Sequence, residues 1–335
     1  MALQSIPTGA IRYNTDSNKM ECFNGTKWYQ ISVSESAPLG GRGCWGGGTT
    51  DGSTYLNAIE YITIATQGDA VDFGDLTVTR SVYGCFASRT RGVFGTGKNP
   101  STQNTLDYIT IATQGDAIDF GDMVGDTDFN IYSDHGCVGS DTRGIVAGSN
   151  TKHVNIHYWT ITSTGNAQDF GDLANGMEEP FGLSNATRAI FGGNSPSASN
   201  IMEYITIAST GNAADFGDLS VTVVNAGGGD TSTRGFIMGS YNHPGYNNYI
   251  DYCTIATLGN AADYGDLTQQ VLTNGIASSP TRICCTGSRY PTSAYNDYPQ
   301  IDMFNPVHKG NAQEFGDLSN PGAFSGAVSN THGGL

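Results

Sequence analysis

The sequence has few basic residues. Its 335 residues include 15 Lys and Arg against 31 Asp and Glu, so the formal net charge is −16 at pH 7. Binding to nucleic acid or to an anionic membrane surface requires clustered positive charge. The composition therefore predicts that the chain binds no nucleic acid.

Long apolar runs are also missing. No stretch approaches the ~20 apolar residues of a transmembrane helix. Residues 1–7 lack the basic and apolar regions of a signal peptide. We expect synthesis as a soluble cytosolic chain with no membrane insertion.

The cysteines do not follow a disulfide or zinc pattern. Their number, seven, is odd, and their spacing shows no pairs. These features argue against a disulfide framework and against a zinc site. The sequence predicts buried free thiols on strands at Cys22, Cys44, Cys85, Cys137, Cys253, Cys284 and Cys285.

Enzyme motifs are absent from the sequence. It contains no P-loop, no dinucleotide fingerprint and no nucleophile motif. His153 and His157 could point the same way along a strand, but no third metal ligand accompanies them. We predict that the chain is not an enzyme, with no catalytic residue, no cofactor and no bound metal.

What the chain has is an internal repeat. Residues 61–76 read Tyr-Ile-Thr-Ile-Ala-Thr-Gln-Gly-Asp-Ala-Val-Asp-Phe-Gly-Asp-Leu, and five further versions follow. The recurring aromatic residues lie 46 to 51 residues apart, a period typical of four-stranded propeller blades. They are Phe73, Phe120, Phe170, Phe216, Tyr264 and Phe315.

Each copy predicts four strands. The β-branched run at 61–66 suits a strand, Gly68 supplies a tight turn, and 70–76 returns as its partner. A glycine-ended strand that begins at an arginine, preceded by Thr in five of the six cases, comes before each copy, and the segment after each Gly-Asp-Leu (Gly-Asp-Met in the second copy) supplies the fourth. We therefore predict an all-β fold: a six-bladed β-propeller over residues 36–335. Residues 323–329 should pair with the strand at Arg42 and close the ring.

Residues 1–35 do not belong to the repeat. Strands are predicted at 11–13, 20–23 and 26–31, with a type I′ turn at Asn24-Gly25. So few short strands are not stable alone. We expect an attachment or oligomerisation module that packs on the propeller, on copies of itself or on a host structure.

Charged residues recur at fixed repeat positions. We predict structural roles: one acidic series caps turns or accepts backbone N–H bonds, and the other pairs with the arginines and links blades. A ring of carboxylates that binds calcium or another cation is the alternative, although the repeat lacks the spacing of a calcium loop. The arginines are Arg42, Arg91, Arg143, Arg188, Arg234 and Arg282; the acidic series are Asp75, Asp122, Asp172, Asp218, Asp266 and Asp317, and Asp72, Asp119, Asp169, Asp215, Asp263 and Glu314.

Most sequence variety falls on one face of the predicted propeller. Two of its loops, 241–249 and 289–298, are rich in Tyr, and a third, 124–132, is acidic. Tyr with Asn, Ser and Gly is typical of adaptable recognition surfaces; alternatively, these loops pack on the rim. The candidate ligand-binding residues are Tyr241, His243, Tyr246, Tyr249, Tyr290, Tyr295 and Tyr298.

Two segments resemble phage proteins. Residues 9–28, Gly-Ala-Ile-Arg-Tyr-Asn-Thr-Asp-Ser-Asn-Lys-Met-Glu-Cys-Phe-Asn-Gly-Thr-Lys-Trp, resemble a segment near the attachment ends of fibre and tail proteins of tailed bacteriophages. The repeats, with their Thr-Gly-Asn-Ala-x-Asp-Phe-Gly-Asp-Leu core, resemble repeat proteins of phages of marine and freshwater bacteria, cyanophages in particular. The succession of strands loosely resembles the kelch blade.

These resemblances imply a virion structural protein, a tail fibre or another fibre that binds the host surface through the variable face. The partners implied are other virion proteins, a host surface glycan or protein, and further copies in a homotrimer. The protein would be made in the host cytoplasm and reside in the virion. A purely architectural virion protein is the alternative. A polysaccharide depolymerase is the third reading, although the Ser-x-Asp-x-Gly-x-x-Trp turn of sialidase propellers is missing.

Overall fold

The computed structural model describes residues 6–15, 19–30, 41–50, 53–123, 136–149, 153–194, 197–242, 245–287 and 298–335. Its contacts divide the chain into two units, Met1–Leu39 and Gly40–Leu335. The predicted boundary between residues 35 and 36 lies outside the described residues. These ranges contain no α-helix, and so no helix that could span a membrane.

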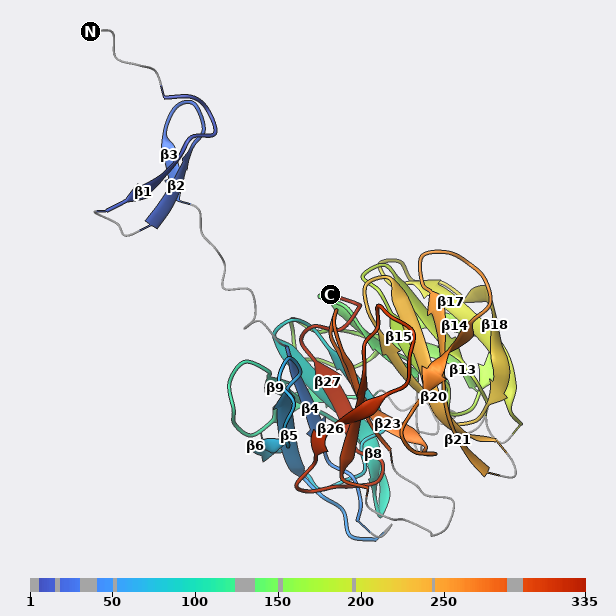
Figure 1. The fold of residues 1–335 in the computed structure, drawn as a ribbon. Coiled ribbons are helices and arrows are strands. Elements are labelled where there is room, and N and C mark those ends of the chain that lie inside the picture. The colour runs from blue at the N-terminus through green and yellow to red at the C-terminus, as the bar shows by residue number, and fades with distance from the viewer. Residues whose placement is uncertain are drawn as a thin grey trace, which may run out of the picture. The chain divides into compact units, whose positions relative to one another are not determined.

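The first unit holds a three-stranded antiparallel sheet of β1 (Ile11–Asn14), β2 (Lys19–Phe23) and β3 (Trp28–Gln30) (Figure 1). The predicted type I′ turn is wrong. Phe23 pairs with Trp28, so the connection has four residues rather than two. The Asn24 side chain accepts hydrogen bonds from the backbone N–H groups of Thr26 and Lys27, which stabilises this longer turn.

The second unit is built from six four-stranded antiparallel sheets (Figure 1). The chain is therefore all-β and propeller-like, as predicted. In order from the first to the fourth strand, sheet 1 is β27 (Gly326–Ser329), β4 (Arg42–Gly46), β5 (Ala58–Thr63) and β6 (Val71–Asp75); sheet 2 is β7 (Gly84–Ala87), β8 (Arg91–Asn99), β9 (Ser101–Thr110) and β10 (Ile118–Asp122); sheet 3 is β11 (Gly136–Gly139), β12 (Arg143–Ala147), β13 (His153–Thr160) and β14 (Gln168–Met177). Sheet 4 is β15 (Phe181–Ser184), β16 (Arg188–Gly192), β17 (Ser199–Thr206) and β18 (Ala214–Val223); sheet 5 is β19 (Gly227–Asp230), β20 (Arg234–Asn242), β21 (Gly245–Thr254) and β22 (Ala262–Asp266); sheet 6 is β23 (Thr273–Ser278), β24 (Ile283–Gly287), β25 (Gln300–Phe304) and β26 (Gln313–Asp317).

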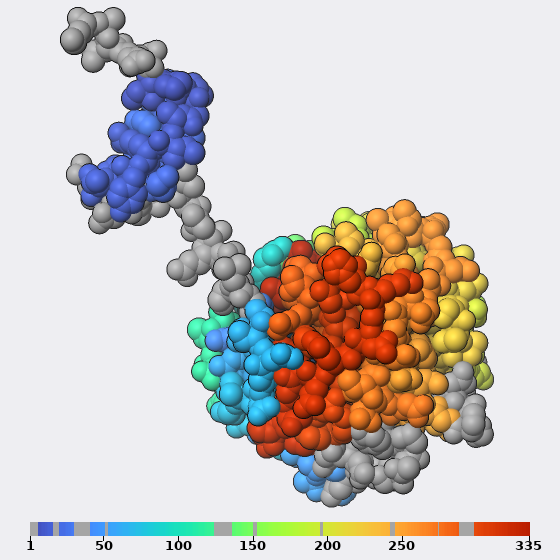
Figure 2. All heavy atoms as spheres, viewed as in Figure 1, coloured from blue at the N-terminus to red at the C-terminus, as the bar shows by residue number. Residues whose placement is uncertain are grey.

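Sheet 1 combines strands from both ends of this unit. β27 pairs with β4, with Gly326 opposite Gly46 and Ser329 opposite Gly43, which is the predicted pairing of residues 323–329 with the strand at Arg42. On the surface, light-blue residues of sheet 1 lie against red residues from the C-terminal part of the chain (Figure 2). β4 therefore pairs along one edge with β5, its neighbour in sequence, and along the other edge with β27 from the far end of the unit.

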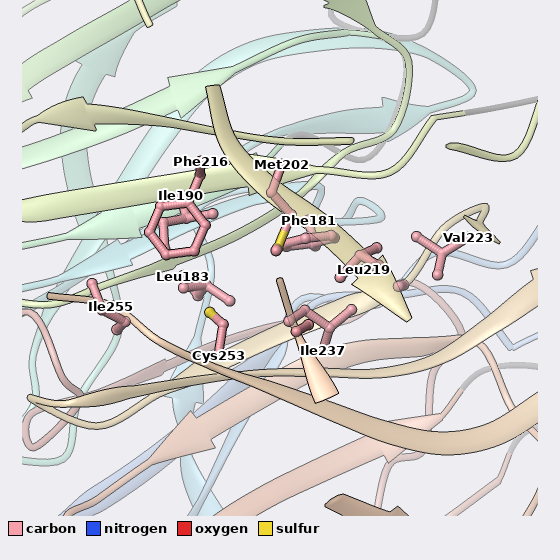
Figure 3. Packing of buried hydrophobic residues seen from close by; sticks show 12 residues of the cluster. Phe181, Leu183, Ile190, Met202, Phe216, Leu219, Val223, Ile237, Cys253 and Ile255 are labelled. Carbon is pink, nitrogen blue, oxygen red and sulfur yellow. The ribbon is translucent and has the colours of Figure 1, made fainter. Parts of the chain in front are cut away.

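The hydrophobic core lies between successive sheets. In one cluster Phe181, Leu183 and Met202 of sheet 4 pack with Ile237 and Cys253 of sheet 5 (Figure 3). Because a sheet between two others is covered on both faces, its second strand is buried at nearly every position. This explains why the glycine-ended strands read as continuous apolar runs rather than as alternating ones.

The strand order gives the sheets two distinct ends. At one, which we call the variable end, the second strand turns into the third and the chain enters the next first strand. At the other, which we call the turn end, the first strand connects to the second and the third to the fourth.

Candidate functional site

The hairpin turn of each sheet bonds the fourth strand of the preceding sheet. At the boundary of sheets 1 and 2, the Gly115 N–H donates to the Phe73 carbonyl at 2.9 Å and the Ala117 N–H to the Asp75 carbonyl at 2.8 Å. In return the Asp75 N–H donates to Asp116 Oδ1 at 3.1 Å. The turn glycine makes the same bond at every boundary, including sheet 1 to sheet 6: Gly68 to Phe315, Gly165 to Phe120, Gly211 to Phe170, Gly259 to Phe216 and Gly310 to Tyr264.

A β-bulge explains the recurring Asp-Phe-Gly-Asp sequence. On β6, Gly74 pairs with Ile59 and Asp72 pairs with Glu60, so Phe73 is the extra residue between them. A bulge re-aims one side chain, and Phe73 is 2% exposed within the core. The bulge therefore positions the aromatic residue that defines the repeat period.

The glycine of that motif permits close approach of the next sheet, a role that the sequence analysis missed. Gly74 has φ +148°, and a Cβ there would lie 2.5 Å from the carbonyl oxygen of Gly115. The corresponding contacts at the other boundaries are Gly121 with Gly165, Gly171 with Gly211, Gly217 with Gly259, Gly265 with Gly310 and Gly316 with Gly68. In the sequence, Gly74 and its counterparts recur shortly after the turn glycine in every copy. This recurrence is the feature from which the close approach could have been predicted.

The repeat arginines connect sheets, but not through carboxylates as predicted. Arg91 donates from Nη1 to the carbonyl oxygen of Ile161 in the turn of the next sheet at 2.9 Å, and its guanidinium lies 4.7 Å from the centre of the Tyr108 ring. No ion pair among the described residues involves a repeat arginine. The others donate likewise: Arg42 to Ile111, Arg143 to Ile207, Arg188 to Ile255, Arg234 to Pro306 and Val307, and Arg282 to Ile64.

The repeat aspartates also differ from the prediction. Each uses its backbone N–H, which donates to the Asn or Asp side chain after the turn glycine of the next sheet. Within the described ranges their carboxylates neither cap a turn nor pair with arginine. They are Asp75, Asp122, Asp172, Asp218, Asp266 and Asp317.

A third acidic column, which the sequence analysis missed, provides five buried carboxylates. Asp107 accepts from Thr77 Oγ1 at 2.6 Å and from the Thr77 N–H at 3.1 Å, across the boundary of sheets 1 and 2. Glu203 accepts from the Ala174 and Asn175 N–H groups in the same way. An acidic residue at this position in five copies was the available signal. The column is Glu60, Asp107, Glu203, Asp251 and Asp302, with His157 at the position in sheet 3.

One carboxylate of that column forms a fully buried ion pair. Arg80 Nη1 lies 2.9 Å from Asp107 Oδ2, and both side chains have 0% exposure. Arg80 Nη2 also donates to the Phe94 carbonyl at 3.2 Å. Removing either partner is expected to destabilise this unit strongly, because the other charge is then left buried and unpaired.

The first strands of the sheets line a cavity of about 150 Å³. Residues 331–335 lie at its turn end: Thr331 Oγ1 donates to the Ser278 carbonyl, His332 Nε2 donates to the Ala87 carbonyl at 3.0 Å, and the Gly333 N–H donates to Asp230 Oδ1 at 2.7 Å. Burial raises the pKa of Asp230, an effect that the nearby His332 opposes. This segment covers the turn end of the cavity.

The cavity's lining at the variable end combines strained backbone with unsatisfied polar atoms. Glu179 and Asn225 have positive φ angles of 53° and 52° although neither is glycine. Such conformations cost about 1–3 kcal/mol each and gather at functional sites. Asn225 Oδ1 and Thr273 Oγ1 are buried with no hydrogen-bond partner among the described residues. The variable end of the cavity is therefore one candidate site.

The predicted tyrosine cluster belongs to the same end, but most of its first stretch is strand rather than loop. Tyr241 of β20 pairs with Tyr246 of β21, and their half-buried rings lie 5.3 Å apart in an edge-to-face arrangement. Hairpin pairing extends to Asn242 and Gly245, because alternating residues here continue the strands. Two half-buried rings thus lie side by side on a paired hairpin.

Two other predicted tyrosines are held by their own sheets. Tyr249 donates to Ser240 Oγ at 3.1 Å and packs against the core, and burial raises the pKa of its hydroxyl. Tyr298 donates to Gln300. The remaining predicted binding residues, His243, Tyr290 and Tyr295, and the acidic loop 124–132 lie outside the described residues.

The cysteines are free thiols, and four of them are buried. Burial raises the pKa of Cys44, Cys253 and Cys284 from the ordinary 9.0 to about 12. Between these values the unfolded chain loses the thiol proton while the folded chain keeps it. Rising pH therefore favours unfolding.

We expect the free energy of unfolding to fall above pH 9 by about 1.4 kcal/mol per pH unit for each of these thiols. Urea unfolding at pH 8, 9, 10 and 11 measures the slope. The Cys284→Ala variant should show a slope smaller by one thiol's contribution, since Lys and Tyr titrate equally in both proteins. An unchanged slope would contradict the assignment.

Among the described residues, no group of three or more His, Cys, Asp or Glu side chains is placed to hold a metal ion. Two candidate sites remain, both at the variable end. One is the Tyr241–Tyr246 hairpin, and the other is the part of the cavity lined by Glu179, Asn225 and Thr273, which we call the cavity mouth.

Neither a scan against models of protein families nor a search of curated proteins finds a match to this chain.

Proposed function

We propose that this chain is a structural protein of a tailed-phage virion, a tail fibre or another fibre that attaches to the host surface. Its six sheets are the blades of a closed six-bladed β-propeller with kelch-like repeats. The first unit mounts the propeller on other virion proteins and joins copies into a homotrimer. The variable end contacts a glycan or protein of the host.

Contacts between first strands support a closed ring. β7 contacts β11, β11 contacts β15, β15 contacts β19, β19 contacts β23, β23 contacts β27, and β27 contacts β7. The turn of sheet 1 bonds the fourth strand of sheet 6 as each other turn bonds its predecessor. A closed ring leaves no first or last blade with an uncovered face. The propeller unit therefore does not aggregate through exposed blades.

The Tyr241–Tyr246 hairpin is the observation that carries the attachment role. The two rings are locked against each other by strand pairing, so little conformational entropy is lost when they bind. Rigid aromatic rings stack on sugar faces and apolar groups, and neighbouring amides supply hydrogen bonds. Several copies on one particle convert weak single sites into firm attachment.

Replacing Tyr241 and Tyr246 together with alanine is expected to lower binding to the host surface at least about tenfold, because two stacking rings contribute on the order of 1.4 kcal/mol or more. The measurement is binding of fluorescently labelled protein to a panel of cyanobacterial cells and to their purified surface polysaccharides. The melting temperature should change little, since a cross-strand pair contributes only about 0.2–1 kcal/mol.

A matched control is Leu258→Ala, which removes a side chain that is 58% exposed in a hairpin turn at the opposite end. Its binding should equal that of the unaltered protein. Binding unaffected by the tyrosine changes would count against this hairpin. No binding to any cell would favour the architectural role, and release of soluble sugar from the polysaccharides would favour a depolymerase.

A further inference from the structure

The chain enters the first strand of each sheet through the same position of the repeat. This position, which we call the entry position, lies five residues before the end of the first strand, as Asn225 does before Asp230. Four of the entry residues line the cavity. The described entry residues are Val82, Glu179, Asn225, Thr273 and Phe324, and the one in sheet 3 lies outside the described residues.

Three entry residues have a left-handed backbone although none of them is glycine. Glu179, Asn225 and Phe324 have φ angles of 53°, 52° and 59°. Glycine would adopt this conformation without a steric cost, and residues that keep a side chain in it gather at functional sites. The strain therefore indicates that the side chains at the entry position are used.

The cavity mouth offers hydrogen-bonding atoms that the described residues leave unpaired. Asn225 Oδ1 is buried without a partner among these residues, and so is the hydroxyl of Thr273, which is 5% exposed. Buried polar atoms in folded proteins are nearly always hydrogen-bonded. An amide oxygen can only accept, so the partner of Asn225 Oδ1 must bring an O–H or N–H group.

An aromatic ring lies across the cavity from this amide. Contacts between first strands run in the cycle β7, β11, β15, β19, β23, β27 and back to β7, so β19 is opposite β7. Tyr83 precedes β7 and lines the cavity, and its ring lies 5.9 Å from that of Phe324 in an edge-to-face arrangement. Aromatic rings stack on the faces of sugars, and amides bond to their hydroxyls. The cavity therefore combines two kinds of contact that suit a sugar ring.

Charge and size limit the class of ligand further. The described residues that line the cavity include no Lys or Arg, but they include Glu179 and Asp230. Anionic ligands are therefore disfavoured. A metal ion is disfavoured as well, because no three His, Cys, Asp or Glu side chains of the described residues come together. The volume of about 150 Å³ suits about one six-membered ring.

We propose that the cavity mouth binds one neutral sugar residue, with a sugar hydroxyl donating to Asn225 Oδ1 and the sugar ring facing Tyr83. The proposal deepens the attachment role, and it rests on that role and on the closed ring. The sugar would be the terminal residue of a host surface polysaccharide. This site is separate from the Tyr241–Tyr246 hairpin, so one propeller would contact the host at two places.

The first test is binding of methyl glycosides of glucose, galactose, mannose and N-acetylglucosamine to the full chain, by saturation-transfer NMR and calorimetry. We expect at least one of them to bind with a Kd of about 1 mM, since few contacts make a weak site. The methyl glycoside of the matching uronic acid should bind at least about tenfold more weakly, because Glu179 repels its carboxylate. No binding of any neutral glycoside, or equal binding of the uronic acid, overturns the proposal.

The second test is Asn225→Gly, which removes the amide and relieves the left-handed strain. Affinity for the methyl glycoside should fall at least about tenfold. The melting temperature should change little, because relieved strain and a more flexible unfolded chain oppose each other. Thr96→Gly is the matched control, since Thr96 also has a positive φ of 53° but does not line the cavity. Unchanged affinity in Asn225→Gly, or an equal loss in Thr96→Gly, overturns the proposal.

Tyr83→Leu examines the aromatic side without depending on the Asn225 variant. It keeps an apolar side chain but removes the stacking ring, so affinity for the methyl glycoside should fall at least about fivefold. Unchanged affinity would contradict the placement of the sugar.

The Tyr241→Ala, Tyr246→Ala variant separates this site from the hairpin, and it should bind the methyl glycoside like the unaltered chain. A loss of glycoside binding in this variant would assign the sugar to the hairpin and overturn the proposal. Glycoside binding by a chain that attaches to no cell would overturn the attachment role but keep the site. Attachment to cells without glycoside binding would keep that role and overturn the site.

Discussion

Replacing Asp107 with alanine is expected to destabilise the larger unit by about 3–5 kcal/mol, since it leaves a fully buried arginine without its counter-charge. Arg80 and Asp107 lie 2.9 Å apart with 0% exposure. The same change removes the acceptor of the Thr77 hydroxyl and N–H. Urea unfolding followed by circular dichroism measures the loss.

An exposed pair provides the matched control for this prediction. Arg89 and Asp141 also join neighbouring sheets, at 3.2 Å, but their side chains are 60% and 51% exposed. Asp141→Ala should cost less than about 1 kcal/mol, because water screens an exposed pair. The double change Arg80→Met with Asp107→Leu should recover part of the loss, since no buried charge remains unpaired. Equal losses for Asp107→Ala and Asp141→Ala would contradict the buried ion pair.

Gly217→Ala is the second change expected to have a large effect. Gly217 has φ +143°, and an added Cβ would lie 2.6 Å from the carbonyl oxygen of Gly259 in the next sheet. Alanine therefore strains the backbone by about 1–3 kcal/mol and overpacks the sheet boundary by about 1–3 kcal/mol more. Thermal and urea unfolding of the variant measure the total.

Gly211→Ala separates the two contributions. Gly211 has φ +154°, but a Cβ there has no atom within 4 Å. This variant should show only the backbone cost of about 1–3 kcal/mol. The difference between the two variants reports how closely sheets 4 and 5 approach. If both lost the same stability, close packing at the boundary would not be supported.

Tight boundaries matter for the proposed attachment role. The cavity lining at the variable end comes from different sheets, with Glu179 before β15, Asn225 before β19 and Thr273 on β23, so its geometry is kept only if the sheets do not shift against one another. The turn bonds, the arginine contacts and the buried carboxylates all cross sheet boundaries. The Asp107→Ala and Gly217→Ala variants should therefore also bind the host surface more weakly.

Strands and turns were predictable because their signals are local. The turn glycine at Gly68 and its partner strand depend only on neighbouring residues, and β6 forms as expected. The strand predicted at 61–66 is shifted: β5 spans Ala58–Thr63, and residues 64–66 belong to the turn. The pairing of β27 with β4 was also predictable, because counting repeat units from both ends leaves one incomplete sheet at each. The Asn24-Gly25 turn failed because the Asn24 side chain stabilises a longer connection.

The candidate site was predicted only in part. Tyr241 and Tyr246 were selected from composition, but composition does not distinguish a loop from an extended hairpin. The strained residues at the cavity mouth, Glu179 and Asn225, were not selected at all. Their positive φ angles arise from how the chain enters the first strand, which no local pattern specifies.

The repeat, the all-β class, the order of strands and the recurring positions could all be predicted from the amino-acid sequence, because they follow from periodicity and from turn-forming glycines. The interactions that the recurring residues make became known only from the packing of the sheets. Arg91 donates to a turn carbonyl rather than to a carboxylate, Asp75 uses its backbone rather than its side chain, and Asp107 is the acid that is buried. Residues of neighbouring repeats meet across a sheet boundary although they are far apart in sequence, as Asp75 and Asp116 do at a separation of 41 positions. Which atoms of these residues form hydrogen bonds depends on the distance between packed sheets, and that distance cannot be read from the order of residues in the sequence.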